Sequence, residues 1–300
     1  MDAIEINRIT MDYGNHKGVF DVSFSVKKGE IMGFLGPNGA GKTTTIRQLL
    51  GFTKPESGTV KILGMDAFKE ADKIAKHTGY LPGEITFIDS MNGMEFIRFV
   101  AGMKGMKDLG RAPELIQRFE LDTVGMIKKM SKGMKQKMGI VCAFMQDPEI
   151  LILDEPTSGL DPLMQNVFVE LLMEEKERGK TVLMSSHIFE EVEKTCDRVA
   201  IIRNGKLMSV ENIEKLKNSR SKTLILRLKD AEDALALCGK YNELTGQMGS
   251  VDETQVTLSV RGNMDALIKL ISQFTVSDME IHTQSLEELF MHFYGGENHD

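Results

Sequence analysis

The chain has 300 residues, of which 41% are hydrophobic and 27% charged, and its formal net charge is −7. This composition is ordinary for a folded protein and excludes a largely disordered one. Residues 217–300 carry −5 of that charge, so neither part of the chain has the basic excess of proteins that bind nucleic-acid phosphates, and we expect no nucleic-acid partner.

No run approaches the roughly 18 to 20 apolar residues that a membrane-spanning helix needs. The first residues, Met1–Glu5, have neither the basic end nor the apolar run of a secretory signal. The cysteines at 142, 196 and 238 fit no zinc or redox spacing, which predicts free thiols. We therefore expect a cytosolic protein.

The first 215 or so residues alternate short apolar runs with amphipathic stretches, the pattern of an α/β domain with a covered sheet. Helical spacing replaces the strand pattern between about 90 and 147, which predicts a helical subdomain inserted into the α/β core. The dipeptide Asn204-Gly205 predicts a hairpin turn. Strands are predicted at 19–26, 31–35, 150–153, 181–184, 199–203 and 206–210, with a helix at 41–50.

After a polar stretch at 215–222 the periodicity restarts, and the order β-α-β-β-α-β favours a small α+β domain with a ferredoxin-like fold. A length of 300 residues also predicts two domains, which we place at 1–216 and 217–300. The predicted strands of the second domain are 223–228, 247–251, 254–260 and 276–283, and its helices are 231–240 and 264–274.

A glycine-rich segment joins the strand at 31–35 to the helix that follows it. Its sequence is Gly36-Pro37-Asn38-Gly39-Ala40-Gly41-Lys42-Thr43, a P-loop. The glycines let backbone N–H groups wrap closely around phosphates, Lys42 reaches the β- and γ-phosphates, and the Thr43 hydroxyl ligates Mg²⁺. With the next residue, Thr44, this segment is the predicted ATP site.

Two adjacent carboxylates, Asp154 and Glu155, end the apolar run at 150–153. Such a pair is costly at the end of a buried strand unless a cation or bound water compensates it. A magnesium and nucleotide site provides both, so Asp154 is predicted to hold Mg²⁺ and Glu155 to act as general base on the attacking water. An ordinary acidic turn is the alternative interpretation.

The segment Met130-Ser131-Lys132-Gly133-Met134-Lys135-Gln136-Lys137 resembles the signature motif of ABC-type ATPases, at the family's distance from the P-loop and from Asp154-Glu155. Taken alone, Ser131 is also a plausible helix N-cap. Ser158-Gly159-Leu160-Asp161 resembles the family's D-loop, His187 its switch histidine, and Tyr13 the residue that stacks on adenine. A lone tyrosine or histidine is more often structural, but these residues follow the family's order.

The resemblance implies a P-loop NTPase fold and a head-to-tail dimer that sandwiches two ATP molecules. Ser131 and Gly133 of one subunit would touch the γ-phosphate held by the other. The chain has one such set, so it needs a partner ATPase subunit, most simply a second copy. The resemblance also implies a separate transmembrane permease as partner, and hence a cytoplasmic protein bound peripherally to the inner face of the cell membrane.

Two positions depart from the family pattern. Its Q-loop glutamine would fall at Gly83, and Glu84 is a candidate replacement. Lys132 and Met134 stand where Gly and Gln are common, and Lys132 is interpreted either as an extra charge near phosphate or as a solvated lysine.

Residues 217–300 resemble the accessory domain of bacitracin, daunorubicin and sodium export subunits, including the ending 285–290, Ser-Leu-Glu-Glu-Leu-Phe. The resulting prediction is an ATP-hydrolysing motor subunit of an exporter. One alternative is an ATP-binding regulatory or scaffolding module that hydrolyses poorly. The other is a soluble ABC ATPase outside transport, although only about 90 residues separate the P-loop from the signature.

Overall fold

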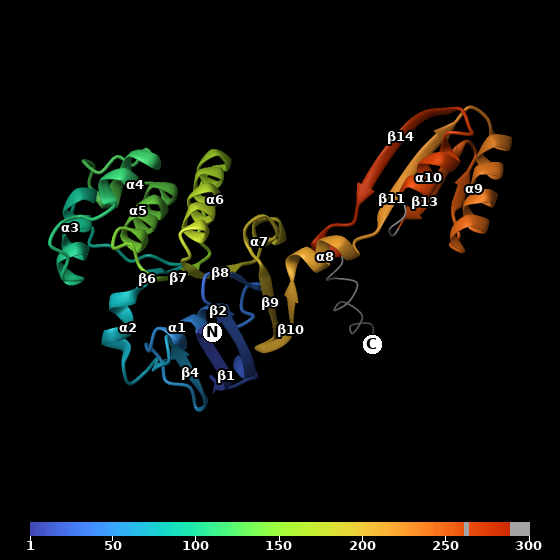
Figure 1. Ribbon diagram of the computed structural model, residues 1–300. Helices are drawn as coiled ribbons and strands as arrows, with labels where there is room; N and C mark the ends of the chain where they lie inside the picture. Colours follow the sequence, from blue (N-terminus) through green and yellow to red (C-terminus); the bar gives the residue numbers. More distant parts are fainter. Residues whose placement is uncertain (261–263, 289–300) are drawn as a thin grey trace. The chain divides into compact units, whose positions relative to one another are not determined.

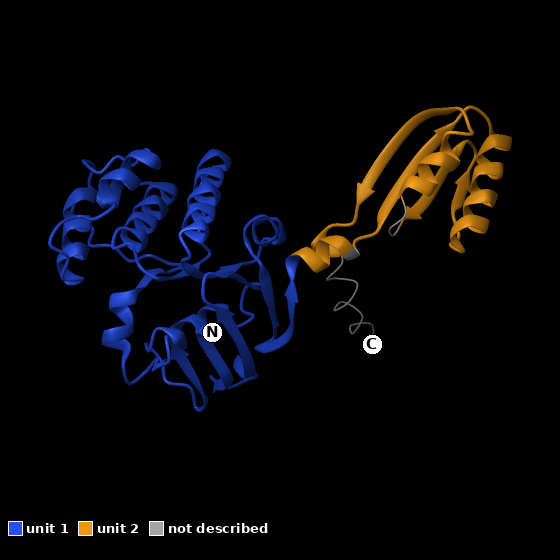
Figure 2. Cartoon of the chain, viewed as in Figure 1, with its two compact units in different colours: residues 1–213 blue, residues 214–300 orange. Residues whose placement is uncertain are grey.

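A computed structural model gives the structure of the chain, and it describes residues 1–260 and 264–288. The chain divides into two compact units, Met1–Ile213 and Glu214–Asp300 (Figure 2). Each unit has its own hydrophobic cluster.

A six-stranded sheet with the order β10-β9-β3-β8-β7-β6 forms the centre of the first unit (Figure 1). Strands β3, β6, β7, β8 and β9 are parallel, and β10 is an antiparallel edge strand. Every residue of β3, β7 and β8 is buried, as expected of parallel strands covered on both faces. The strands are β3 (Ile31–Leu35), β6 (Thr78–Leu81), β7 (Ile150–Asp154), β8 (Thr181–Ser186), β9 (Arg198–Arg203) and β10 (Lys206–Asn212).

A second, antiparallel sheet has the order β2-β1-β4-β5. Helix α1 packs against strands of both sheets, and one hydrophobic cluster runs through them, with the rings of Phe24 and Phe34 5.1 Å apart. The strands are β1 (Asp2–Asp12), β2 (Gly18–Lys27), β4 (Ser57–Ile62) and β5 (Met65–Asp66). Outside residues 90–147, the helices of this unit are α1 (Lys42–Leu49), α2 (Ala71–His77), α6 (Pro162–Glu177) and α7 (Phe189–Thr195).

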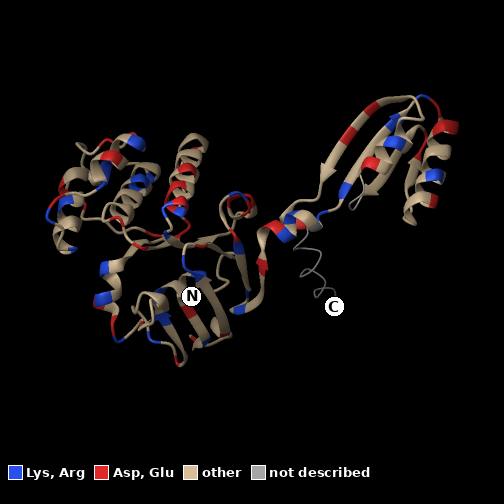
Figure 3. Cartoon of the chain, in the orientation of Figure 1, with Lys and Arg blue, Asp and Glu red and all other residues tan. Residues whose placement is uncertain are grey.

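The helices predicted between 90 and 147 are present as α3 (Gly93–Met103), α4 (Ala112–Arg118) and α5 (Lys132–Phe144), with a short 3-10 helix at Ile127–Lys129. Salt bridges tie these helices to α6. The guanidinium of Arg118 lies 2.5 Å from Glu174, and Arg111 contacts the buried Glu175. Figure 3 shows that residues of both charge signs lie on α4 and α6.

From β11 to β14 the second unit has the element order β-α-β-β-α-β, and its strands are all antiparallel in the order β12-β13-β11-β14. Tyr241 is fully buried in its core. The elements are β11 (Lys222–Leu228), α9 (Ala231–Thr245), β12 (Ser250–Asp252), β13 (Gln255–Val260), α10 (Met264–Ile271) and β14 (Val276–Thr283). Leu289 and Phe290, the end of the segment likened to the exporter subunits, lie outside the described residues.

The polar stretch at 215–222, to which the sequence assigns no helix or strand, lies mostly in a helix, α8 (Ile213–Ser219). The side chain of Ile213 is buried and that of Leu216, three residues further on, is half-buried. One apolar stripe therefore suffices for a helical turn within a segment that is otherwise polar.

Candidate functional site

The candidate site lies at the carboxyl ends of the parallel strands, the edge at which open α/β sheets bind their ligands. The P-loop follows β3, Gly83 follows β6, Asp154 ends β7 and His187 follows β8. A cleft of about 460 Å³ opens at this edge. It is lined by Asn38, Thr43, Arg47, Tyr80, Pro82, Gly83, Glu84, Lys132, Asp154, Glu155 and Ser158.

The P-loop takes a backbone path that requires glycine. Gly39 and Gly41 have φ angles of 80° and 109°, in the left-handed region. A Cβ on Gly41 would lie 2.6 Å from Val19 Cγ1. The hairpin predicted at Asn204-Gly205 supports the loop from outside, because the Gly205 N–H donates to the Ala40 carbonyl at 3.0 Å. Both turn residues have positive φ, which confirms the predicted turn.

Lys42 is buried, with 5% of its side chain exposed. Its ammonium donates to the carbonyl of Gly36 at 2.6 Å and to that of Pro37 at 3.2 Å. It also lies 3.5 Å from Glu155 Oε1. The ammonium is therefore held over the loop that would surround the phosphates.

Asp154 is fully buried at the end of β7 and accepts two hydrogen bonds. The Thr43 hydroxyl donates to its Oδ2 at 2.9 Å, and the Ser185 hydroxyl donates to its Oδ1. A hydroxyl and a carboxylate in contact are the protein ligands that suit Mg²⁺, which takes one or two carboxylates and completes its shell with phosphate and water oxygens. The residues present thus fit the ion.

Glu155 follows Asp154 with a φ of 48°, a left-handed conformation that costs about 1 to 2 kcal/mol in a residue with a Cβ. Its N–H donates to the backbone carbonyl of Ser185 at 3.2 Å and to the Ser185 hydroxyl at 3.1 Å. Its carboxylate oxygen Oε1 lies 3.3 Å from Nδ1 of the half-exposed His187. The structure therefore brings Lys42, Glu155 and His187 together.

The signature segment begins α5. The Ser131 hydroxyl accepts from the Met134 N–H at 3.2 Å, so the N-cap interpretation is confirmed. The Lys132 ammonium donates to the Ser158 hydroxyl at 2.9 Å, and Lys132 lines the cleft, so its interpretation as an extra charge near phosphate stays a prediction. Ser131 and Gly133 do not line the cleft of their own chain.

Tyr13 lies in the turn between β1 and β2, with 58% of its surface exposed, and it is not part of the cleft lining. Thr44 is half-buried beside Thr43. The sequence prediction that both residues contact nucleotide stays a prediction.

Gly83 lies directly beside Asp154, since a Cβ at this position would be 3.3 Å from Asp154 Oδ2. Glu84 also lines the cleft, and its substitution for the Q-loop glutamine stays a prediction. Tyr80 completes this wall. Burial, with a smaller contribution from the charge of Asp154, raises the pKa of Tyr80 to about 12, so its hydroxyl stays protonated.

Two residues at this site were not predicted to belong to it, Ser185 and Gln136. The Ser185 hydroxyl on β8 bonds to Asp154 and to the Glu155 N–H, and the Gln136 amide on α5 donates to the carbonyls of Glu155 and Pro156. Of these two, Gln136 carried a sequence signal, as a polar residue within the quoted signature segment.

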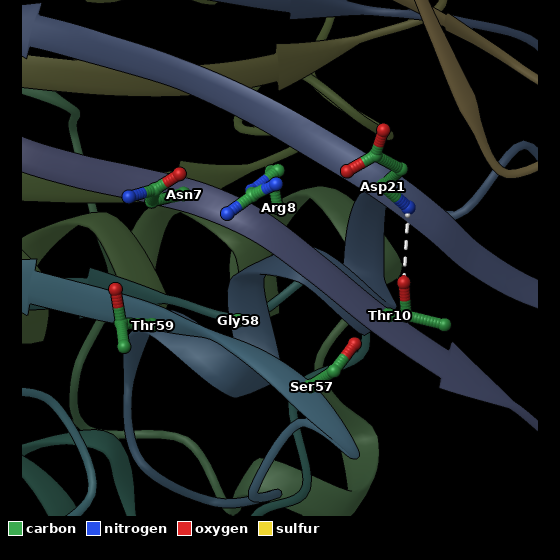
Figure 4. Close-up of a pocket in the computed structure, with 7 residues that line it drawn as sticks. All are labelled: Asn7, Arg8, Thr10, Asp21, Ser57, Gly58 and Thr59. Carbon is green, nitrogen blue, oxygen red and sulfur yellow. Dashed lines mark hydrogen bonds between the residues drawn. The ribbon is translucent and has the colours of Figure 1, made fainter.

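A second polar pocket, of about 370 Å³, lies on the antiparallel sheet between β1, β2 and β4 (Figure 4). There the Thr10 hydroxyl accepts from the Asp21 N–H at 3.0 Å. The residues that line this pocket do not include those of the P-loop cleft.

Within the described part of the chain, no helix has the length and hydropathy needed to cross a bilayer.

Comparison with known proteins identifies the family. Residues 19–158 match the family described as ABC transporter.

The bacitracin transport ATP-binding protein BcrA of Bacillus licheniformis is 35% identical, over 98% of this chain and 97% of its own length. A solved ATP-binding subunit of an ABC transporter is 32% identical, with a TM-score of 0.65, over 72% of this chain and 92% of that one. The fold is also that of the cassette MJ0796, which has a TM-score of 0.63 at 22% identity and covers 70% and 98% of the two chains. The chain therefore belongs to the ABC transporter family, as one of its ATP-binding subunits.

Proposed function

We propose that the chain hydrolyses ATP in a site that two subunits complete together, and that this hydrolysis drives a separate membrane permease. The contact of Thr43 with Asp154, beside Lys42 and Glu155, is the observation that carries the proposal. It would combine a cation site, a phosphate-binding lysine and the Glu155 carboxylate at one edge of the sheet.

Within the site, Lys42 would release the carbonyls of Gly36 and Pro37 and donate to the β- and γ-phosphates. Glu155 would accept the proton of the attacking water, and its quarter-exposed carboxylate leaves room for that water. His187, 3.3 Å from the same carboxylate, would contact the γ-phosphate and keep Glu155 oriented.

Thr43 and Asp154 would hold Mg²⁺, the Asp154 carboxylate through the water shell of the ion. The ion would screen the negative charge on the β- and γ-phosphates. The direct hydrogen bond between the Thr43 hydroxyl and the Asp154 carboxylate shows that these two side chains converge on one point. Tyr13 would stack on adenine, and the P-loop with Thr44 would surround the phosphates.

The second half of the site would come from another copy of this chain. Ser131 and Gly133 stand at the start of α5, where a hydroxyl and free N–H groups suit a phosphate, but they are outside their own cleft. A head-to-tail dimer would bring each of these helix ends to the nucleotide of the other subunit.

The permease would be a different chain, contacted by the helical subdomain, and the protein would sit peripherally on the cytoplasmic face of the membrane. Export is the proposed direction, because residues 217–300 resemble the accessory domain of export subunits and because BcrA, a bacitracin transport protein, is similar over almost the whole length. Residues 217–300 would then be an accessory domain of the exporter type.

The test is ATP turnover of the purified chain, alone and with its permease, for the wild type and Glu155→Gln. Removal of a general base is expected to lower turnover about 100-fold or more, with ATP binding retained. Equal turnover of the two proteins would refute hydrolysis by this subunit and leave the regulatory or scaffolding module as the function.

A further inference from the structure

Gln136 lies five residues after the N-cap of α5, and its side chain is buried, with 4% of its surface exposed. Its amide donates to the carbonyl of Pro156 at 2.8 Å and to that of Glu155 at 3.3 Å. The helix that carries the signature segment is therefore bonded to the backbone of the proposed general base in the same chain.

This bond matters because Glu155 has the left-handed φ of 48°, which a residue with a Cβ keeps only when its surroundings impose it. Ser185 holds the N–H side of Glu155. On the carbonyl side, the Ser158 N–H donates from within the loop at 3.1 Å, and Gln136 donates from outside it. Gln136 thus ties the backbone carbonyl of Glu155 to helix α5.

The first turn of α5 contacts the same loop at two more points. Lys132 donates to the Ser158 hydroxyl, and a Cβ on Gly133 would lie 2.7 Å from the carbonyl oxygen of Gly159. These contacts leave little freedom between the start of α5 and residues 155–159. A shift of one should therefore move the other.

We propose that Gln136 is a positioning residue for Glu155. By its two hydrogen bonds it sets the backbone from which the Glu155 carboxylate projects, and it links that carboxylate to the position of α5. This inference rests on the proposed function, in which the start of α5 meets the partner's nucleotide. Engagement of that nucleotide by Ser131 and Gly133 would then align Glu155 at the chain's own site.

The experiment is a double-mutant cycle of Gln136→Met and Glu155→Gln, measured as the single-turnover rate of ATP cleavage and as the dissociation constant for ATP. Methionine keeps the length of the side chain and removes the amide donor. The matched control is Gln146→Met, since Gln146 follows α5 at its other end and its side chain also makes two hydrogen bonds. Its amide N–H donates to the Lys76 carbonyl at 3.4 Å, and its amide oxygen accepts from the Lys104 ammonium at 3.3 Å.

In the wild-type background Gln136→Met is expected to slow cleavage about 10- to 100-fold, because small misplacements of a catalytic group have effects of this size. The dissociation constant for ATP should stay within about twofold of wild type. In the Glu155→Gln background the same change should have almost no further effect, since the group that Gln136 positions is already disabled. Gln146→Met should leave both quantities unchanged.

The proposal is overturned if Gln136→Met slows cleavage by the same factor in both backgrounds, because a merely structural role would have that effect. It is also overturned if Gln136→Met leaves the wild-type rate unchanged. If the methionine variant does not fold, Gln136→Asn, which keeps a shorter donor, should give a smaller loss with the same non-additivity and is judged by the same criteria. Equal rates for wild type and Glu155→Gln would instead refute the base assignment, and this proposal with it.

Discussion

Replacing Ser185 by alanine removes a hydroxyl that is fully buried between β7 and β8. This hydroxyl donates to Asp154 Oδ1 and accepts from the Glu155 N–H at 3.1 Å. The N–H keeps its bond to the Ser185 carbonyl at 3.2 Å, and Asp154 keeps the Thr43 hydroxyl at 2.9 Å. The main loss is therefore one hydrogen bond to a buried carboxylate, worth about 1.5 to 3 kcal/mol.

For a folding unit of this size, a loss of about 2 kcal/mol should lower the unfolding temperature by about 4 to 8 °C. Thermal unfolding of the nucleotide-free protein, followed by circular dichroism, measures this shift. Turnover should fall as well, because Ser185 holds the backbone of Glu155 in place.

Ser209→Ala is the matched control. The Ser209 hydroxyl is also buried, but it has no hydrogen-bond partner among the described residues. Its removal should leave the unfolding temperature unchanged or raise it slightly, because an unpaired buried hydroxyl is unfavourable. Equal losses for the two variants would refute the reasoning, since they would reflect the lost volume and not the bond to Asp154.

Two further predictions follow from burial and from the cation site. Burial raises the pKa of the Cys142 and Cys196 thiols to about 12, so at pH 8 only about one in 10⁴ is a thiolate. Alkylation by iodoacetamide, followed by mass spectrometry, should be at least about 100-fold slower in the native than in the urea-unfolded protein, and equal rates would contradict this. Chelation of Mg²⁺ by EDTA should abolish turnover. It should leave the unfolding temperature of the nucleotide-free protein unchanged, because Thr43 and Asp154 bond to each other directly without the ion. Turnover in the presence of EDTA would show that the reaction does not need Mg²⁺.

Features set by neighbouring residues were predictable from the sequence. The P-loop needs a strand, its glycines and a helix in succession, and all three occur where expected. The hairpin at Asn204-Gly205 has the positive φ angles that this dipeptide favours. By contrast, α8 was missed because most of its residues are polar and only two apolar residues, Ile213 and Leu216, mark its buried face.

The parts that escaped prediction depend on contacts between distant segments. Ser185 is the second-last residue of β8 and becomes important only because β7 and β8 pair with Asp154 opposite Ser185. In the sequence, nothing distinguishes Gln136 from the other polar residues of its helix. Its role depends on the fold, which places the 155–159 loop against it. Such partners follow from sheet register and helix packing, which spacing along one sequence does not encode.

The central claim is that each ATP site needs the P-loop of one chain and the signature segment of another, and mixing two disabled variants tests it most directly. Lys42→Ala disables the P-loop. Ser131→Asp keeps a good N-cap for α5 but sets a negative charge against the partner's phosphate. Each variant alone should be inactive. In a 1:1 mixture half of the dimers would pair unlike chains and hold one intact site, so about a quarter of wild-type turnover should return. A mixture no more active than either variant alone would contradict the account.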